Sequence, residues 1–185
     1  MKNDVKYKLD PHDRIIEVNE TWDLFACENG AEELVTEHII GQSLFKHIVG
    51  DPTQMYVQTL LGYVRTVQTP VSRDYRCDSD NQKRFMQMHL IPAPNKCIRL
   101  EHKTIRIEPI LPAISFQYQP KSALIIRCSV CNKIRGEGQI WLDVEQAVLD
   151  NKVFQERVNP TVYTVCPTCK TSLPVSLKHK VCQPE

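Results

Sequence analysis

Two pairs of cysteines in the C-terminal third constrain this chain more than any other feature. Cys128 and Cys131 form one C-x-x-C pair, and Cys166 and Cys169 form a second. Two residues between thiols allow both sulfurs of a tight turn to face one ion, and a second such turn completes a tetrahedral all-sulfur set that suits zinc. The spacing therefore predicts a zinc site whose ligands are Cys128, Cys131, Cys166 and Cys169.

Thiol redox chemistry and chance pairing of buried cysteines are the alternatives to a metal site. A thioredoxin-like site normally has one C-x-x-C after a strand in an α/β unit, which is not the pattern here. Haem attachment needs a His directly after the second Cys, where Asn132 and Lys170 stand. Four protein thiolates leave no coordination position for a substrate, so we expect structural rather than catalytic zinc. A zinc-thiol switch, in which oxidation releases the metal, stays open.

The residues between the two pairs are expected to fold around the metal. Trp141, Val144 and Val148 fall on one face of a predicted helix. Residues 161–165 are typical of a β-strand that leads into the second pair. Such a small module buries little apolar surface, and metal binding should supply most of its folding free energy.

Length and charge limit the classes of partner. A chain of 185 residues is long enough for one ordinary domain and a minidomain. The net charge of +1, from 23 basic and 22 acidic residues, gives no electrostatic reason to expect a nucleic-acid partner. No stretch approaches the roughly 20 apolar residues of a membrane span, and residues 1–6 lack the apolar core of a signal peptide. We therefore expect a cytoplasmic protein with reduced thiols and no membrane contact.

Residues 1–110 have the pattern of an α+β domain with a mostly antiparallel sheet. A short strand at 15–18 precedes several helical segments, and the longest of these opens at Asp51-Pro52-Thr53, with Pro at the first helical position. Three alternating strand patterns follow between residues 71 and 107. One strand, several helices and a three-strand meander define the α+β class.

Several short motifs in this order resemble the PAS domain, and within it a little-characterised bacterial group. The motifs are Ile15-Ile16-Glu17-Val18-Asn19-Glu20-Thr21-Trp22, Phe25-Ala26-Cys27-Glu28-Asn29-Gly30, Ile40-Gly41 and Tyr75-Arg76-Cys77-Asp78-Ser79. The resemblance covers about residues 7–110. It implies a five-stranded antiparallel sheet with helices on one face, a sensing function and a homodimer.

The resemblance also implies a ligand pocket between the helices and the inner face of the sheet. The apolar and aromatic residues expected to line it are Trp22, Phe25, Phe45, Leu60, Val64, Tyr75, Met86, Met88 and Leu100. The alternative is that these side chains only form the core, because pockets are few. The ligand is unknown; His89 and His102 raise a haem hypothesis, although a lone His on a strand is more often a surface or hydrogen-bonded residue.

The tail resembles the cysteine-rich segments that follow PAS or sensor modules in some bacterial signalling proteins. The matching residues are Cys131-Asn132-Lys133-Ile134-Arg135, Trp141 and Val165-Cys166-Pro167-Thr168-Cys169. The chain departs from that pattern at Asn132, where Lys is usual, and at residues 162–164, where Ser-His-Gly is usual. No role of that His carries over to this protein.

No catalytic arrangement is evident in the sequence, which has no Gly-rich phosphate loop, nucleophile elbow or H-E-x-x-H. We expect a signalling sensor or adaptor and not an enzyme. A PAS-like domain at 1–110 would bind a small ligand or a protein partner, a linker would span 111–124, and a zinc-ribbon-like module would occupy 125–185. A pure interaction adaptor without a ligand is the alternative. Arg76 and Asp78 are expected to form a structural salt bridge.

Overall fold

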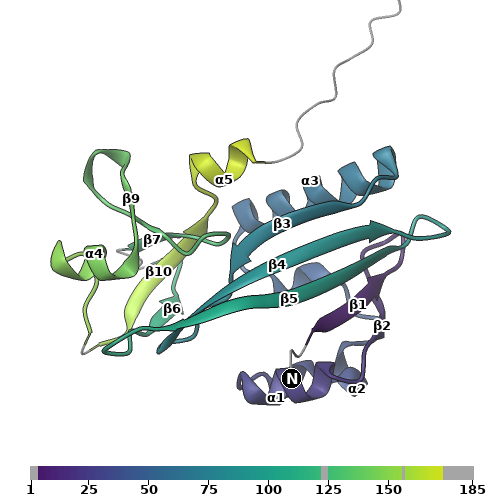
Figure 1. The fold of residues 1–185 in the computed structure, drawn as a ribbon, viewed down its shortest axis with the longest axis horizontal. Helices are drawn as coiled ribbons and strands as arrows, with labels where there is room; N and C mark the ends of the chain where they lie inside the picture. The colour runs from purple at the N-terminus through teal and green to yellow at the C-terminus, as the bar shows by residue number, and fades with distance from the viewer. Residues whose placement is uncertain (1–3, 122–124, 156, 173–185) are drawn as a thin grey trace, which may run out of the picture.

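The computed structural model describes residues 4–121, 125–155 and 157–172. Each of its two sheets is built from a consecutive part of the chain (Figure 1). We call residues 4–109 the N-terminal region and residues 110–172 the cysteine region. No helix in the described part of the chain is long and apolar enough to cross a membrane.

The N-terminal region consists of two strands, a run of helices and three further strands. In chain order these are β1 (Val5–Leu9), β2 (Ile15–Val18), α1 (Trp22–Glu28), the 3₁₀ helix η1 (Glu32–Leu34), α2 (Thr36–Ile39), the 3₁₀ helix η2 (Leu44–His47), α3 (Asp51–Val67), β3 (Val71–Arg76), β4 (Gln82–Pro92) and β5 (Ile98–Pro109). The predicted α+β class is confirmed.

The first sheet has the order β2-β1-β5-β4-β3, and every neighbouring pair is antiparallel. The helices all lie between β2 and β3 in the sequence, so the chain crosses from one edge of the sheet to the other through them (Figure 1). A leading strand pair, a helical crossover and a three-strand meander make this the expected PAS-like fold. β1 is the strand that the residue pattern alone did not predict.

Helix α3 joins the helices to the sheet. Gly50 at φ 85 and Pro52 near the first turn begin the helix, and Gln68 ends it in the left-handed conformation at φ 56. Its buried face consists of Tyr56, Leu60, Leu61 and Val64. These positions are three and four residues apart, so one stripe of the helix covers the inner face of the sheet.

The sheet shows the alternation that the sequence predicts. On β4, Met86 and Leu90 are buried on the inner face, whereas Gln87 and His89 bond to residues of β3 on the outer face. The outer face is polar and the inner face is apolar, as expected for an antiparallel sheet covered on one side.

The cysteine region contains short strands and short helices. These are β6 (Phe116–Tyr118), β7 (Ile125–Cys128), β8 (Ile134–Arg135), the 3₁₀ helix η3 (Glu137–Gln139), β9 (Trp141–Leu142), α4 (Val144–Leu149), β10 (Asn159–Thr164) and α5 (Pro167–Thr171). Its sheet has the order β6-β10-β7-β8-β9, with β10 parallel to both of its neighbours. The first cysteine pair lies at the turn of the β7–β8 hairpin.

Two sequence-based expectations for this region differ from the structure. Part of the expected linker at 111–124 forms β6, which pairs with β10, because Phe116 and Tyr118 belong to a strand pattern that the flanking prolines obscure. Trp141 was expected on a helix but lies on β9, opposite Arg135. Asp143 is the N-cap residue and has extended backbone, so α4 begins only at Val144. Cys182 lies outside the described residues.

The two regions share one hydrophobic core. Cys128, Val130, Val165 and Cys166 of the cysteine region belong to the same buried cluster as Leu60 of α3. A second, smaller cluster fills the cysteine region itself and contains Ile110, Ile114, Ile125, Ile134, Val144, Ala147 and Val153. The cysteine pairs therefore lie where the two regions meet.

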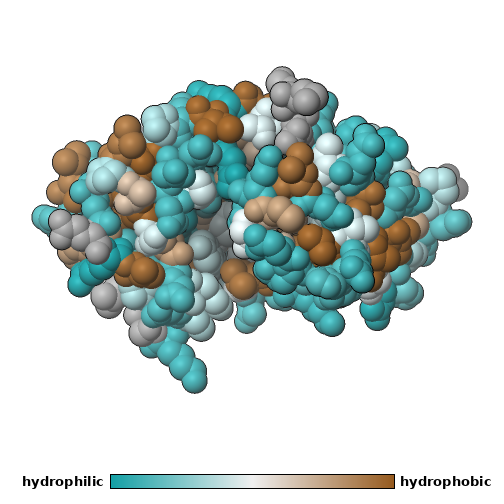
Figure 2. Space-filling view, turned by 90° about the horizontal axis from the view of Figure 1, so that it is seen from below, coloured by the Kyte–Doolittle hydropathy of each residue, from teal (hydrophilic) through white to brown (hydrophobic). Residues whose placement is uncertain are grey.

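The surface is mostly hydrophilic on the face shown in Figure 2, with separate apolar patches and a hollow between the two regions. A groove on the molecule is lined by Phe25 of α1, by Asn29 at the end of that helix and by residues 77–82. Phe25 therefore faces this polar groove instead of the predicted ligand pocket. We assign no catalytic or binding site to this open groove.

Candidate functional site

The four predicted cysteines come together although they lie in two separate parts of the chain. Cys128 ends β7 and Cys131 lies in the turn that follows, whereas Cys166 is the N-cap residue of α5 and Cys169 lies within that helix. Their Sγ atoms all lie within 4.8 Å of one another. Strand β10 is parallel to β7, so the ends of both strands bring the two pairs to one edge of the sheet.

The geometry fits a single four-coordinate ion. Zn–S bonds of about 2.3 Å in a tetrahedron place neighbouring sulfurs about 3.8 Å apart. The Sγ atoms of Cys131 and Cys166 lie 3.8 Å apart. Cys128 and Cys166 are buried, and the other two cysteines are half-buried. Four soft sulfur donors in one cluster make a donor set for zinc or another thiophilic metal.

The backbone around Cys128 supports a thiolate. The N–H groups of Val130 and Cys166 point to the Cys128 Sγ atom at 3.5 and 3.4 Å. The neighbouring thiols of Cys131 and Cys169 lower the pKa of Cys128, because they donate hydrogen bonds to its thiolate. That shared charge raises the pKa of Cys131 to about 12 and raises the pKa of Cys169. A bound metal ion would displace the protons that Cys131 and Cys169 hold.

The first cysteine turn is held against the edge of the first sheet. The Arg76 N–H at the end of β3 donates to the Val130 carbonyl at 2.7 Å. Asn132 has φ 58, and its side-chain amide donates to the Arg76 carbonyl at 3.4 Å. Asn tolerates this left-handed conformation better than Lys, which gives a physical reason for the departure from the Lys of the resembling segments.

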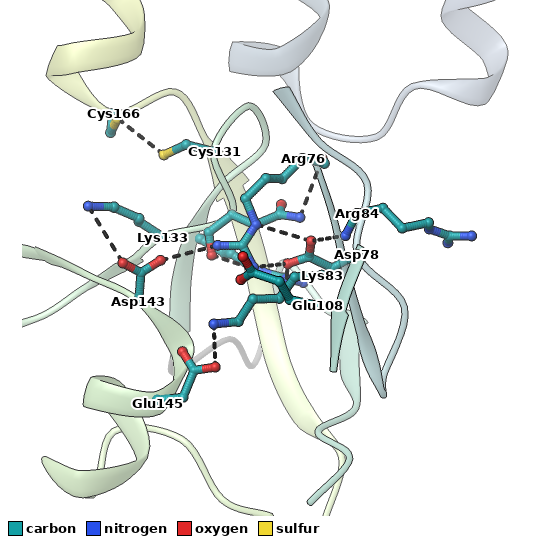
Figure 3. Close-up of polar contacts among 12 residues, drawn as sticks. Arg76, Asp78, Lys83, Arg84, Glu108, Cys131, Lys133, Asp143, Glu145 and Cys166 are labelled. Atoms are coloured by element: carbon teal, nitrogen blue, oxygen red, sulfur yellow. Dashed lines mark hydrogen bonds and ion pairs between the residues drawn. The ribbon is translucent and has the colours of Figure 1, made fainter. Parts of the chain in front are cut away.

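A buried ion network joins the regions beside this turn (Figure 3). The Asp78 side chain is only 1% exposed and contacts Arg76 at 2.6 Å and Arg127 at 3.1 Å. Arg76 also contacts Asp143 at 3.1 Å. Burial lowers the pKa of Arg127, and Asp78 opposes that shift. The predicted Arg76–Asp78 salt bridge is confirmed, and it extends to two residues of the cysteine region.

A cavity of about 230 Å³ lies between α3, the inner face of the first sheet and the first cysteine turn. The side chains around it come from every layer of the N-terminal region, and Ser129 and Val130 complete the wall. The lining residues are Tyr7, Leu44, Ile48, Thr53, Tyr56, Val57, Leu60, Arg73, Tyr75, Met88, Leu90, Leu100, His102, Ser129 and Val130. The cysteine turn is therefore part of the cavity.

The structure places the nine predicted pocket residues in different surroundings. Leu60, Tyr75, Met88 and Leu100 line the cavity. The other five residues are not among its lining residues. Val64 and Met86 are buried in the core, and Trp22 and Phe45 pack at its edge. Phe25 lines the separate groove.

Trp22 shows why an apolar pattern alone does not identify a pocket. Its indole N–H donates to the Leu34 carbonyl at 2.7 Å, and its ring meets Tyr7 edge-on at 5.5 Å. The residue therefore fixes α1 to β1 and η1. A buried aromatic side chain with a satisfied polar group is a core residue.

The cavity wall also carries polar atoms that have no hydrogen-bond partner in the described part of the chain. These include Thr53 Oγ1, Arg73 Nε and His102 Nε2. The other ring nitrogen of His102, Nδ1, lies 2.8 Å from the Tyr75 hydroxyl. Burial lowers the pKa of His102 to about 4, so the ring is neutral at pH 7. Sequence reasoning missed Thr53, Arg73, Ser129 and Val130, and alternation along β3 is the signal that places Arg73 with Tyr75.

The two histidines considered for haem lie on opposite faces of the sheet. His89 bonds to Ser72 on the outer face at 2.7 Å, and His102 faces the cavity. Ligand pockets for drug-sized molecules occupy about 300 to 1,000 Å³. A cavity of about 230 Å³ is smaller than that range and does not accommodate a haem. This geometry favours a smaller ligand.

Cys77 does not join the metal cluster. It is half-buried just beyond β3, and burial raises its pKa, so it behaves as a small apolar residue with an unreactive thiol. Cys27 is exposed and Cys97 is half-buried, and neither lies with the four clustered cysteines.

Comparisons with known proteins give structural neighbours only. No family model matches the chain, and no curated protein matches it. Solved structures that resemble it include a domain of an HTR-like protein from Haloarcula marismortui, with 16% identity, a TM-score of 0.42, and coverage of 56% of this chain and 99% of that chain. The PAS domain of BvgS from Bordetella pertussis has 19% identity, a TM-score of 0.39 and coverage of 56% and 73%.

A third neighbour is the PAS domain of the quorum-sensing receptor RpfR from Cronobacter turicensis, in complex with C12:0. It has 18% identity, a TM-score of 0.39, and coverage of 56% of this chain and 95% of that chain. All three are similar to this chain in fold at most. The PAS-like assignment of the N-terminal region rests on its own strand order and helical crossover.

Proposed function

We propose that this protein is a signalling sensor in which a PAS-like region and a zinc-holding cysteine region act as one unit. The observation that supports the proposal is the composition of the cavity wall. Ser129 and Val130, which stand between the ligands Cys128 and Cys131, face the same cavity as Leu60 and Met88. A molecule that enters the cavity therefore contacts the turn that holds half of the metal site.

Zinc is the metal that we propose for the four sulfurs. An all-cysteine set in which each sulfur lies within 4.8 Å of the others suits tetrahedral zinc. Four protein ligands leave no open position, so we assign the ion a structural role. The cysteine region would then fold only when metal is bound. Because its first turn borders the cavity, the surface that it presents to a partner would depend on whether metal and ligand are bound.

The output that we propose is a contact with a protein partner, without catalytic turnover. Six large apolar side chains of the cysteine region are exposed, among them Ile140 at 62%, Leu149 at 75% and Val158 at 49%. Exposed apolar side chains favour protein contact when they lie on one surface. These residues also support the second candidate, an adaptor that docks a signalling protein in the cytoplasm without binding a small molecule.

Native mass spectrometry of the purified full chain, combined with metal analysis, separates these functions. The sensor proposal predicts one zinc ion per chain and either a copurified small molecule or an increase in melting temperature when a small molecule fills the cavity. One zinc ion with no ligand under any condition would favour the adaptor. Loss of zinc at low peroxide doses would instead indicate a thiol switch. The same spectra report the number of subunits.

A further inference from the structure

We propose that the cavity beside the cysteine turn binds a small organic acid, with Arg73 holding the carboxylate and the apolar wall holding the remainder. This inference rests on the proposed sensor function and names the class of its ligand. It starts from polar atoms at the cavity wall that are buried and lack partners in the described structure: Thr53 Oγ1, the Tyr56 hydroxyl, Arg73 Nε and His102 Nε2.

Buried polar atoms without partners cost folding free energy, because they lose their hydrogen bonds to water. Such atoms in one cavity indicate that something else supplies the hydrogen bonds. Arg73 of β3 and His102 of β5 lie on either side of Met88 of β4, on the inner face of the sheet. Thr53 comes from α3, which covers this face. All of these residues line the same cavity.

The charge of the wall indicates an anion. Arg73 contributes a guanidinium, and its Nη1 donates only to the neighbouring Ser72 carbonyl at 2.6 Å. No ion pair joins Arg73 to a carboxylate in the described residues, and no Asp or Glu lines the cavity. A guanidinium whose Nε–H is buried beside an unfilled space, with no acidic partner, matches a carboxylate ligand.

The second donor is His102. Burial raises the pKa of Tyr75 far above its usual range, so its hydroxyl keeps its proton and can donate it to His102 Nδ1, 2.8 Å away. In the tautomer in which it does so, the neutral imidazole carries its own proton on Nε2, which makes Nε2 a donor with no acceptor in the described residues. Arg73 and His102 thus present N–H groups to the same cavity, and a ligand with acceptor oxygens satisfies both.

The remainder of the wall sets the size and polarity of the ligand. Leu60, Met88 and Leu100 supply apolar surface, and Tyr7 stacks on the His102 ring at 5.4 Å. A volume of about 230 Å³ limits the ligand to a short molecule. A compact carboxylic acid with an apolar body meets every one of these conditions.

Calorimetry on the zinc-loaded full chain tests the proposal with three probes of equal length: hexanoate, 1-hexanol and hexylamine. We expect hexanoate to bind at least tenfold more tightly than the other two. Arg73→Gln should weaken hexanoate binding by tenfold or more and leave 1-hexanol unchanged, because hydrogen bonds to charged groups contribute about 1.5 to 3 kcal/mol. Arg73→Lys should retain part of the preference. Arg99→Gln on the outer face is the matched control and should change nothing.

Equal affinity for the three probes, or full hexanoate affinity in Arg73→Gln, would overturn the organic-acid assignment. The comparison of probes on the unmodified protein needs no variant, so a folding defect in Arg73→Gln does not affect it. Binding of 1-hexanol without preference for hexanoate would reject only the ligand class. Absence of binding by all three, with no copurified molecule in native spectra, would reject the ligand-sensing function as well.

Discussion

The two regions of this molecule are stabilised in different ways. The N-terminal region closes a five-stranded sheet with a 17-residue helix and buries large side chains such as Leu9, Leu60 and Ile98 completely. The cysteine region has strands of two to six residues and a smaller apolar cluster. Apolar burial stabilises the first region, whereas we propose that metal binding by the four sulfurs stabilises the second.

The boundary between these two kinds of stability does not follow the chain. Cys128 and Val130 belong to the cysteine region by sequence, yet they pack in the core of the N-terminal region. The end of β3 also bonds to the first cysteine turn. A module that is stabilised by metal can therefore form part of the wall of a cavity that apolar packing builds.

The largest expected effect comes from removal of one sulfur. In Cys128→Ser the cluster loses the sulfur that accepts two backbone N–H groups, and we expect zinc to be lost and residues 125–171 to unfold. Structural zinc contributes about 10 to 16 kcal/mol in zinc-finger peptides, so no other substitution here should cost as much. Metal content and limited proteolysis measure the change.

Cys97→Ser is the matched control for that experiment. Cys97 is half-buried and lies outside the cluster, so the variant should retain zinc and resist protease as the unmodified protein does. Stoichiometric zinc in Cys128→Ser would contradict the assignment of the four ligands.

The next effect concerns the buried ion network between the regions. Asp78→Asn leaves Arg76 and Arg127 without their shared carboxylate, and we expect unfolding to cost about 3 to 5 kcal/mol less. Because the network joins the two regions, its loss in Asp78→Asn should uncouple them. Denaturant unfolding of this variant, monitored in each region, should then show two separate transitions. Asp74→Asn on the exposed outer face should shift the midpoint little, and an unchanged single transition in Asp78→Asn would show that the network does not couple the regions.

A core truncation should act mainly on the N-terminal region. Leu60 is fully buried on α3 and lines the cavity, so Leu60→Ala should lower the free energy of unfolding by about 2 to 5 kcal/mol. Leu24, which is 52% exposed on α1, provides the control, and Leu24→Ala should stay within about 0.5 kcal/mol. If the four sulfurs hold the cysteine region through zinc, as we propose, zinc content should not change in either variant. Loss of zinc in Leu60→Ala would contradict this prediction, because it would show that the metal site depends on the core of the N-terminal region.

The smallest effect should be seen as a pH dependence. Burial beside Tyr7 and Tyr75, with a smaller contribution from His89, lowers the folded-state pKa of His102 to about 4 from 6.5. Between these values the unfolded chain binds a proton that the folded chain does not, so stability falls as pH falls from about 6.5 to about 4. The loss is at most about 3 kcal/mol. Urea unfolding should show a weaker pH dependence for His102→Gln than for the unmodified protein.

Sequence patterns predicted those parts of the fold that follow from local periodicity. The buried face of α3 and the alternation along β4 were both visible in the spacing of apolar residues. The clustering of four cysteines was visible in their spacing, and they meet because parallel pairing of β7 and β10 aligns two distant turns. These features need only short-range rules and one strong chemical motif.

The features that the sequence did not predict depend on contacts between distant segments. β6 is short and has prolines nearby, so only its pairing with β10 defines it as a strand. The cavity wall combines Arg73 of β3 with Val130 of the cysteine turn. These residues lie 57 positions apart in the sequence, and no motif links them. An apolar pattern also does not distinguish core residues such as Val64 from cavity residues such as Leu60, which lie one helical turn apart on α3.

Hydrogen exchange of the zinc-loaded and the metal-stripped full chain is the most direct test that four sulfurs fold the cysteine region and complete the cavity of its neighbour. Stripping should accelerate exchange throughout residues 125–171 and at residues 73–76, which border the first cysteine turn, while β1 and β5 stay protected. Slow exchange of residues 125–171 in metal-free protein would contradict this picture.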